Sequence, residues 1–553
     1  MKLFPFSLIC GFLSWGVGIR VLNAEVRLPG IFGDHMVLQQ ESKLPVWGWA
    51  DPGEEVTVTF GDQSGKATAA KDGSWRVDLK PVASSSVATT LTVTGRNNIT
   101  IQDVLVGEVW ICSGQSNMAF NLHSAHNAAK VVPEANDPQM RFFVVSAKIS
   151  LQPETEVGGN WKVCTPEIAK GFSGVGYFFG QELRKTLQRP VGLIGSYWGG
   201  TPAQSWTSLE GLEKAPPFAN YVDAFNKIVS GLEQAKKDYP AALASYEEEQ
   251  KQWQAEIGPT FDAAMKEWAG VVKKAKTEGQ LIPPLPTPSK PKPKAPPVPG
   301  NVPQYPTVLY NGMIAPLIPY AIKGAIWYQG ESNGGMPLEY RTLFPRMITD
   351  WREKWGEGDF PFLFVQLANF TKRQTQPSEQ GWAWLREAQL MTLSLPNTGM
   401  ASAIDVGNGG DIHPTDKYDV GLRLALAARH VAYGQELVYS GPIYESMKIA
   451  GDTIRLAFKH AGKGLTIGVP PWAPTGVPAM GSELTGFAIA GADKKWFWGK
   501  ATIEGDAVLV QSAEVPAPVA VRYAWASNPA ANLYNKDGLP ASSFRTDNWT
   551  DSK

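Results

Sequence analysis

The chain has 553 residues, which is enough for three or four domains and a large hydrophobic core. Its 51 lysines and arginines almost balance its 52 aspartates and glutamates, and the net charge is −1. This balance argues against the strongly basic class of nucleic-acid-binding proteins and against an acidic disordered protein. The composition therefore indicates a multidomain globular protein with no nucleic acid among its partners.

The first 24 residues have the pattern of a signal peptide. Lys2 precedes an apolar stretch, Leu3 to Val21, and Ala24 ends a short segment suited to cleavage. A membrane-spanning helix is the competing interpretation, which a proline, three glycines and Arg20 within the stretch weaken. We therefore expect export to the periplasm or the extracellular space. No later apolar run is long enough for a membrane span in the mature chain.

Few cysteines remain after the expected cleavage. Cys10 leaves with the signal peptide, and the mature chain keeps Cys112 and Cys164. Two cysteines do not make a disulfide framework. They can form one bridge in an oxidising compartment or remain as buried thiols, and the sequence leaves both alternatives open.

Short β-branched segments separated by turn residues fill positions 25–103. Turn signals recur at roughly ten-residue spacing and helical periodicity is absent, which predicts an N-terminal β-rich domain similar to a small β-sandwich. The expected strands lie within 35–40, 44–50, 54–60, 74–79 and 89–95.

From residue 104, apolar runs suited to buried strands alternate with helical periodicity. This alternation predicts parallel βαβ units, and hence a three-layer α/β domain made of residues 104–212 and 307–434. The expected strands lie at 104–112, 191–198, 321–330, 360–368 and 399–407, and the expected helices at Tyr177–Leu187, Glu339–Trp355, Trp382–Leu395 and Thr415–Ala432. Ligands of such domains bind at the carboxyl ends of the strands, so the loops that follow them are the place to look for a site.

Residues 213–306 interrupt the alternation. Positions 221–278 are rich in Ala, Lys and Glu with spaced aromatics, which predicts one or two amphipathic helices. A proline-rich basic segment follows and cannot form a core, so we expect an extended strap. We interpret the whole segment as an insertion in a loop of the α/β domain. Strand patterns return in 435–553 and predict a C-terminal β-rich module.

Ser116 is the strongest candidate for a nucleophile. It lies in the sequence CSGQSNM, directly after the expected strand 104–112. A serine between the end of a strand and the start of a helix places its Oγ and its backbone N–H at the carboxyl edge of the sheet, as acyl transfer requires. A serine that caps a helix N-terminus gives the same local pattern, and the local sequence alone does not separate the two.

Among the six histidines, His413 is the best placed to act as a base. It lies between the last expected strand of the α/β domain and its last helix, and therefore at the same edge of the sheet as Ser116. Asp411 lies two residues before it. His123 and His126 follow Ser116 in sequence, but their setting is more typical of surface histidines than of substrate contacts.

Two further loops offer donors for an oxyanion. Gly199 and Gly200 follow the expected strand 191–198, where their backbone N–H groups can approach a ligand closely, although glycines also form tight turns. Gln329 lies at the end of the expected strand 321–330 and carries an amide that can donate a hydrogen bond, to a ligand or within its loop.

Taken together, these motifs resemble the four sequence blocks of the SGNH hydrolases. More narrowly, they resemble the sialate O-acetylesterase branch of the carbohydrate esterases. The resemblance covers about residues 104 to 430 without the insertion and implies a flavodoxin-like α/β/α fold flanked by β-sandwich-like modules. The residues that carry it are Ser116 in GQSNM, Gly199 and Gly200 in WGGT, Gln329 in WYQGESN and His413 in DIHP.

The resemblance implies covalent serine catalysis without a metal or a cofactor. The roles that it implies are Ser116 as nucleophile, His413 as base, the oxyanion donors Ser116 N–H, Gly199 or Gly200 and Gln329, and the loop-orienting residues Asn117 and Glu331. In one respect the chain departs from the family, which has Asp three residues before the His. That position is Gly410 here. We expect Asp411 to orient the imidazole, with Asp405, a backbone carbonyl or a Ser–His dyad as the alternatives.

The expected function is a carbohydrate O-acetylesterase whose substrate is an O-acetylated sugar, most specifically a sialate O-acetylesterase. The alternatives are an acetylesterase for xylan or another plant polysaccharide and, from another class, a non-catalytic glycan-binding protein. The carboxylate of sialate calls for a cationic side chain near Ser116. The candidates are Lys372, Arg373 and Arg386.

Overall fold

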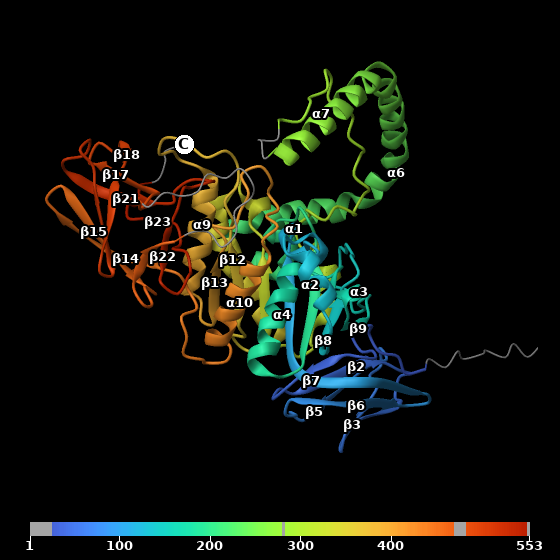
Figure 1. Cartoon of the computed structure of the whole chain (residues 1–553). Coiled ribbons are helices and arrows are strands. Elements are labelled where there is room, and N and C mark those ends of the chain that lie inside the picture. The colour runs from blue at the N-terminus through green and yellow to red at the C-terminus, as the bar shows by residue number, and fades with distance from the viewer. Residues whose placement is uncertain (1–24, 279–282, 469–482, 550–553) are drawn as a thin grey trace, which may run out of the picture.

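A large mixed β-sheet organises the middle of the molecule (Figure 1). The structure is a computed structural model that describes residues 25–278, 283–468 and 483–549, so the expected signal peptide lies outside the described residues. From one edge of the sheet to the other, the strands are β13 (Thr398–Ser402), β12 (Phe362–Gln366), β11 (Gly324–Tyr328), β7 (Asn98–Gly114), β10 (Val191–Tyr197), β8 (Asp137–Val144) and β9 (Trp161–Cys164).

The sheet contains every strand that the sequence predicts for the α/β domain, together with two that it does not. The additional strands are β8, which is parallel to β10, and β9, which is antiparallel to β8. The prediction of a purely parallel sheet is therefore wrong. β9 has only four residues, and two of them are not buried, so no continuous apolar run marks it in the sequence.

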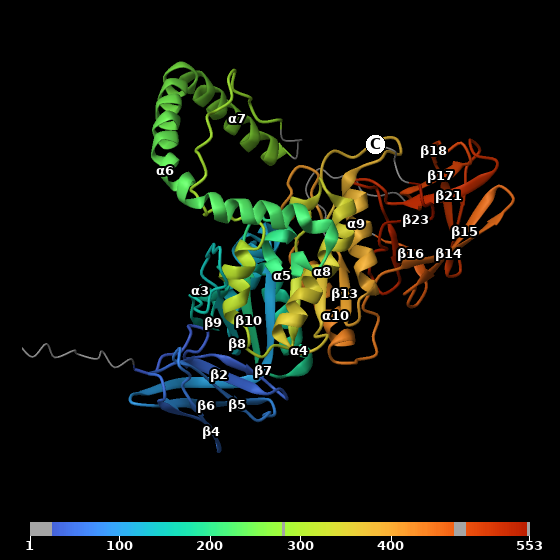
Figure 2. The same ribbon diagram turned by 180° about the vertical axis from the view of Figure 1, so that it is seen from behind.

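Helices cover the sheet in two pairs, as the opposite views of Figures 1 and 2 show. α4 (Gly174–Leu187) packs against α10 (Tyr418–Val431), and α8 (Pro337–Trp355) packs against α9 (Gly381–Met391). The positions confirm the expected helices to within a few residues at their ends. Gly421 lets the first pair approach closely, because a Cβ there would lie 2.7 Å from Cβ of Phe178.

The order and direction of the strands bring the loops that follow them to one edge of the sheet. The chain passes from β7 to β10 on one side and then returns to β11 on the other side of β7. β7, β10, β11, β12 and β13 are parallel, so their carboxyl ends lie at one edge of the sheet. The reversal of strand order next to β7 is the position where open α/β sheets bind their ligands.

β7 joins the N-terminal strands to the central sheet. Its first part pairs with β6 (Ser85–Thr94) and its last part with β10 and β11. The expected domain boundary at residues 103 and 104 thus falls within one strand, at Asp103, which has a φ of +54°. The expected strands of this region are present as β1 (Val37–Gln39), β2 (Leu44–Trp49), β3 (Glu55–Phe60), β5 (Ser74–Leu79) and β6, with β4 (Gln63–Thr68) in addition.

Two long helices, α6 (Ala219–Glu256) and α7 (Gly258–Glu278), form an arm that projects from the body (Figure 1). The arm begins on the body, where Tyr221 and Phe225 are buried. The described part of the proline-rich segment returns along the helices, since the indole of Trp253 donates a hydrogen bond to the Lys290 carbonyl at 2.8 Å.

The C-terminal module has its own hydrophobic core between two antiparallel sheets. One sheet contains β14 (Ile443–Ala450), β15 (Thr453–Lys459), β20 (Ala507–Gln511) and β19 (Lys500–Glu504), and the other contains β18 (Trp496–Trp498), β17 (Phe487–Gly491), β21 (Pro518–Tyr523) and β23 (Phe544–Arg545). The module lies beside β13 and α9 (Figure 1).

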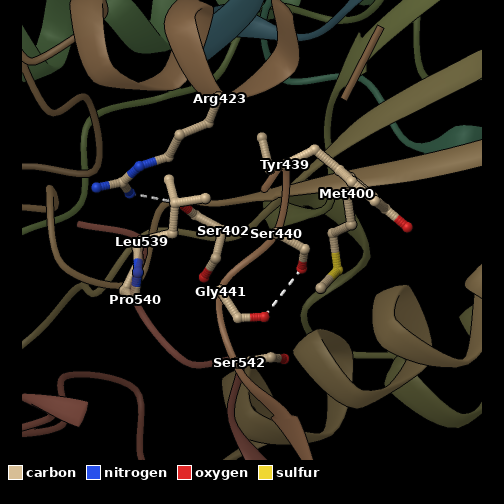
Figure 3. Close-up of a pocket in the computed structure, with 10 residues that line it drawn as sticks. Met400, Ser402, Arg423, Tyr439, Ser440, Gly441, Leu539, Pro540 and Ser542 are labelled. Atoms are coloured by element: carbon tan, nitrogen blue, oxygen red, sulfur yellow. Dashed lines mark hydrogen bonds between the residues drawn. The ribbon is translucent and has the colours of Figure 1, made fainter. Parts of the chain in front are cut away.

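A small cavity marks the junction between β13 and this module (Figure 3). Arg423 of α10 lines it and donates a hydrogen bond to the carbonyl of Ser402 at 2.6 Å. With a volume of about 10 Å³, the cavity has room for one water molecule and not for a sugar. It is therefore part of the packing between the two units.

The structure also bears on the cysteines and on membrane insertion. Cys112 and Cys164 are both buried and free, so the alternative of a disulfide between them does not hold.

Among the helices of the described ranges, none combines the length and the apolar character that a membrane span needs.

Candidate active site

Ser116 is the first residue of a short helix that follows the central strand β7 in the chain. β7 ends at Gly114, and α1 (Ser116–Ala119) starts two residues later. Gly114 has a φ of +135°, and a Cβ on it would lie 2.2 Å from the Tyr328 carbonyl oxygen, so only glycine fits between β7 and β11 here. The tight turn after Gly114 places Ser116 at the carboxyl edge of the sheet.

The imidazole of His413 lies against the Ser116 hydroxyl. Its Nε2 is 2.9 Å from Oγ of Ser116, although 297 positions separate the two residues in the chain. His413 comes from the loop between β13 and α10, the position that the sequence predicts. A serine in hydrogen-bonding contact with an imidazole is the arrangement in which the imidazole can remove the hydroxyl proton.

Asp411 lies on the other side of the His413 ring. Its Oδ1 accepts a hydrogen bond from the backbone N–H of His413 at 2.9 Å and lies 3.4 Å from Nδ1. The carboxylate is 57% exposed, so it approaches the ring from a solvated position. Asp405 is buried instead and accepts hydrogen bonds from Arg423.

The two candidate glycines differ in their surroundings. A Cβ on Gly199 would lie 3.4 Å from Cβ of Ser116, so the Gly199 backbone lies next to the serine. Gly200 has a φ of +70°, and the nearest atom to a Cβ there would be Nε2 of Gln304, at 3.9 Å. The Gly200 carbonyl accepts a hydrogen bond from this same Nε2 at 3.0 Å. The geometry therefore favours Gly199 as the glycine that faces the reacting group.

Gln329 is fully buried and fully hydrogen-bonded. Its amide nitrogen donates to Oδ1 of Asn333 at 2.7 Å and to the carbonyl of Thr201 at 3.3 Å, and its Oε1 accepts from the Tyr340 hydroxyl at 2.9 Å. In this arrangement the side chain ties the loop after β11 to the loop that carries Gly199. A role as oxyanion donor requires that the longer bond, to Thr201, be exchanged for one to the oxyanion.

Asn117 connects the loops of the site. Its Nδ2 donates to Oε1 of Glu331 at 2.6 Å and to the carbonyl of Ile412 at 3.0 Å. Its Oδ1 accepts from Nζ of Lys417 at 2.6 Å. The contact brings Asn117 and Glu331 together, as the loop-orienting assignment requires, and it adds Lys417, which the sequence analysis did not single out.

Lys417 and Glu331 are charged groups in a desolvated environment. Burial lowers the pKa of the Lys417 amine from 10.5 to about 7, against the opposing effects of Glu331, Asp416 and Asp411. Burial also raises the pKa of the Glu331 carboxyl, whose Oε2 has no hydrogen-bond partner among the described residues. Ionisable groups with such shifts are common next to catalytic centres.

The cationic residues expected near Ser116 are placed differently. Arg386 is fully buried and donates to the backbone carbonyls of Leu367, Ala368, Ala526 and Ser527, so it cannot bind a substrate carboxylate. Within the part of the chain that the structure describes, neither Lys372 nor Arg373 makes a hydrogen bond or an ion pair with Ser116 or His413. His123 is exposed, as expected for a surface histidine. The side chain of His126 is only 22% exposed, and its Nδ1 lies 3.9 Å from Oδ1 of the buried Asp416.

No group of three or more His, Cys, Asp or Glu side chains in the described ranges is arranged to hold a metal ion. The chemistry that the site offers is that of a serine nucleophile beside an imidazole, with backbone N–H groups at the start of α1 and at Gly199 close by. This combination suits acyl transfer from an ester.

Comparison with known proteins supplies the chemical context. The family described as carbohydrate esterase, sialic acid-specific acetylesterase, matches residues 106–282 and 302–431. Sialate O-acetylesterase of Mus musculus is 32% identical over 469 residues, which cover 78% of this chain and 78% of that protein. The Homo sapiens enzyme of the same name is 30% identical over 469 residues, which cover 78% of this chain and 76% of that protein.

Solved structures include a similar bacterial protein. The crystal structure of a carbohydrate acetylesterase from Xanthomonas citri has 37% sequence identity and a TM-score of 0.74, and the match covers 95% of this chain and 100% of that one. The similarity thus extends through the β-rich modules on both sides of the central sheet.

Proposed function

Because the chain belongs to the carbohydrate esterase family of sialic acid-specific acetylesterases, we propose that it is a serine O-acetylesterase that releases acetate from O-acetylated sugars, with sialic acid as the sugar. That the protein is an esterase follows from its family. The observation that carries the proposed mechanism is the 2.9 Å contact between Ser116 Oγ and His413 Nε2.

The proposed reaction has two stages. His413 takes the proton of the Ser116 hydroxyl while Oγ attacks the acetyl carbonyl, and the imidazolium then protonates the departing sugar oxygen. Water, activated by His413, hydrolyses the acetyl-enzyme and releases acetate. The proposed oxyanion donors are the backbone N–H groups of Ser116 and of Gly199, whose backbone lies next to Ser116, and Gln329 either joins them or holds the Gly199 loop in place.

Asp411 is the proposed third member of a triad. Its Oδ1 lies 3.4 Å from Nδ1 of His413, and the bond to the His413 backbone holds the carboxylate next to the ring. A carboxylate in this position favours the tautomer with a proton on Nδ1 and stabilises the imidazolium. A Ser–His dyad is the alternative, and the exposure of Asp411 is the observation that favours it.

The fold supports the same assignment. A strand order that reverses next to β7, with helix pairs α4–α10 and α8–α9 around the sheet, fits the three-layer flavodoxin-like domain of SGNH hydrolases. We also propose that the segments 104–212 and 307–434 act as the catalytic domain and that residues 1–24 direct export, so that the enzyme works in the periplasm or outside the cell.

The substrate has a second candidate. Arg386 is buried in backbone contacts and is not available to the carboxylate of sialate, and the bacterial relative of known structure is named only a carbohydrate acetylesterase. These two observations are the support for the second candidate, a neutral acetylated polysaccharide such as xylan.

Acetate release from a panel of substrates tests the proposal. The purified protein is incubated with O-acetylated sialic acid, acetylated xylan, acetylated pectin and a small aryl acetate, and the Ser116→Ala variant is the control. We expect acetate from the sialic acid and none from the control. Release from xylan or pectin alone would select the second candidate, and no release from any ester would leave a glycan-binding protein.

A further inference from the structure

We propose that Lys417 is a positioning residue of this esterase, which holds the Asn117 side chain in the one orientation that ties the loop of the nucleophile to the loop of the base. The inference rests on the proposed roles of Ser116 and His413. It concerns a residue that does not touch the reacting atoms and acts through another side chain.

The position of Lys417 is unusual for a lysine. The residue is fully buried at the start of α10. Its Nζ lies 2.6 Å from Oδ1 of Asn117 and faces two aromatic rings, with 4.6 Å to the centroid of Phe120 and 5.3 Å to that of Tyr328. The Lys417 amine thus donates its hydrogen bond to the Asn117 side chain.

Asn117 is adjacent to Ser116 in the chain, and its contact Ile412 is adjacent to His413. The hydrogen bond from Nδ2 of Asn117 to the Ile412 carbonyl, at 3.0 Å, therefore links two loops that lie 295 positions apart in sequence. A shift of either loop changes the distance between Oγ and Nε2, on which proton transfer depends.

Lys417 stabilises the observed orientation of the Asn117 amide from the side of its oxygen. The carbonyl of Ile412 and the ionised carboxylate of Glu331 can only accept, and the N–H groups of Lys417 donate to Oδ1 of Asn117. With the amide reversed, its oxygen would face two acceptors and its NH2 group would face the lysine donors. The amine of Lys417 thus leaves one orientation of the amide favourable.

Stability alone does not explain a lysine at this position. Burial of an amine in apolar surroundings is unfavourable, and it lowers the pKa of Lys417 to about 7. The carboxylates of Glu331, Asp416 and Asp411 oppose this lowering. An unbranched apolar side chain of similar length, such as Met, would fill the space between the two rings without this penalty, so the hydrogen bond to Asn117 is the distinguishing contribution of the amine.

A double-mutant cycle tests the inference with Lys417→Met, Asn117→Ala and the double variant, assayed on a small aryl acetate. We expect Lys417→Met to lower kcat by about 10-fold or more, with KM within about 2-fold of wild type. The double variant should be no less active than Asn117→Ala alone, because Lys417 acts through Asn117. Losses that multiply in the double variant, or a Lys417→Met variant within about 2-fold of wild type, would overturn the proposal.

Thermal unfolding separates positioning from a structural role. Lys417→Met should keep or raise Tm while kcat falls, and a parallel fall of Tm and kcat would overturn positioning in favour of structural support. If Lys417→Met does not yield folded protein, Lys417→Leu, which also lacks a donor for Asn117, replaces it in the same cycle with the same two outcomes. Failure of the proposed function is recognised separately, because the wild-type protein would then not hydrolyse the aryl acetate, or Ser116→Ala would hydrolyse it equally well.

Discussion

Both carboxylate oxygens of Asp405 accept hydrogen bonds from Arg423, Oδ1 at 2.6 Å and Oδ2 at 2.8 Å. The Tyr534 hydroxyl of the C-terminal module also donates to Oδ2, at 2.8 Å. Asp405 thus joins the end of β13 to α10 and to the C-terminal module. Its carboxylate serves the structure, and Asp411 is the acid that lies beside the base.

This difference predicts opposite effects for two Asp→Asn variants. Asp411→Asn should lower kcat by about 10²-fold, because the amide no longer favours the productive tautomer of His413. Asp405→Asn should change kcat by less than about 10-fold but destabilise the fold by about 3–5 kcal/mol, because Arg423 is left without its buried counter-charge. Steady-state kinetics and thermal unfolding of both variants measure the two effects.

The two variants serve as controls for each other. Small losses of kcat in both would support a Ser–His dyad. A large loss of kcat confined to folded Asp405→Asn would show that the acid of the triad is Asp405.

Ser116→Ala should remove nearly all esterase activity and leave the fold intact. We expect kcat/KM to fall by about 10³-fold or more, since no acetyl-enzyme can form. Hydrolysis of an aryl acetate gives the rate, and circular dichroism checks the fold. Ser124→Ala is a matched control, since Ser124 is an exposed serine eight positions further along the chain, and it should retain full activity. Activity of Ser116→Ala within a few-fold of wild type would contradict the assignment of the nucleophile.

Gln329→Ala should lower both activity and stability. Loss of an oxyanion donor lowers kcat by about 10²-fold, and loss of a buried, fully bonded amide costs about 1–3 kcal/mol of stability. Tyr340→Phe is the matched control, because it removes the bond to Oε1 of Gln329 and keeps the Gln329 amide, and its kcat should stay within a few-fold of wild type. A change in KM alone for Gln329→Ala would instead mean that this residue binds the ground state of the substrate.

The sequence predicts which loops meet at the edge of the sheet, because the relevant signals are local. Buried apolar runs mark the strands before Ser116, Gly199 and Gln329, and parallel strands bring their carboxyl ends to one edge. His413 follows another such strand. The contact between Ser116 and His413 is a consequence of this topology, and no longer-range information is needed to anticipate it.

The features that the sequence does not predict depend on contacts between distant segments. β9 is too short to show a pattern, and its pairing with β8 is antiparallel. Lys417 lies at the start of a helix, where a lysine is normally solvated, and its burial results from the packing of Phe120 and Tyr328 around it. Of the bonds that occupy the Gln329 amide, the one to the Thr201 carbonyl comes from a loop that only the folded chain brings close.

Removal of the projecting part of the helical arm should leave the hydrolysis of a small aryl acetate unchanged. The root of α6 must stay, since Tyr221 and Phe225 are buried on the body, and so must Gln304, which binds the Gly200 carbonyl. A Cβ on Gly300 would lie 3.0 Å from Cδ1 of Leu232. Helix α6 and the segment that returns to the body therefore lie side by side at this level.

Deletion of residues 234–298 therefore leaves two chain ends that lie close together, and a short Gly/Ser linker can join them. We expect kcat and KM for the aryl acetate to stay within about 2-fold of wild type, because the closed linker leaves the loops of the site in place. Loss of activity only on acetylated glycan would make the arm a substrate-binding element. Loss of folding would contradict the prediction and show that the arm is needed for the stability of the body.

Lys417 should also give the protein a distinctive dependence of stability on pH. Burial lowers the pKa of its amine from 10.5 to about 7 in the folded state. Between pH 7 and pH 10 the unfolded chain therefore holds a proton on Lys417 that the folded chain has lost, so stability rises with pH over this range. We expect wild type to gain stability relative to Lys417→Met from pH 7 to pH 10, by on the order of a few kcal/mol at most. Unfolding curves of both proteins at several pH values measure the difference, and a difference that stays constant or shrinks would show that Lys417 remains protonated in the folded protein.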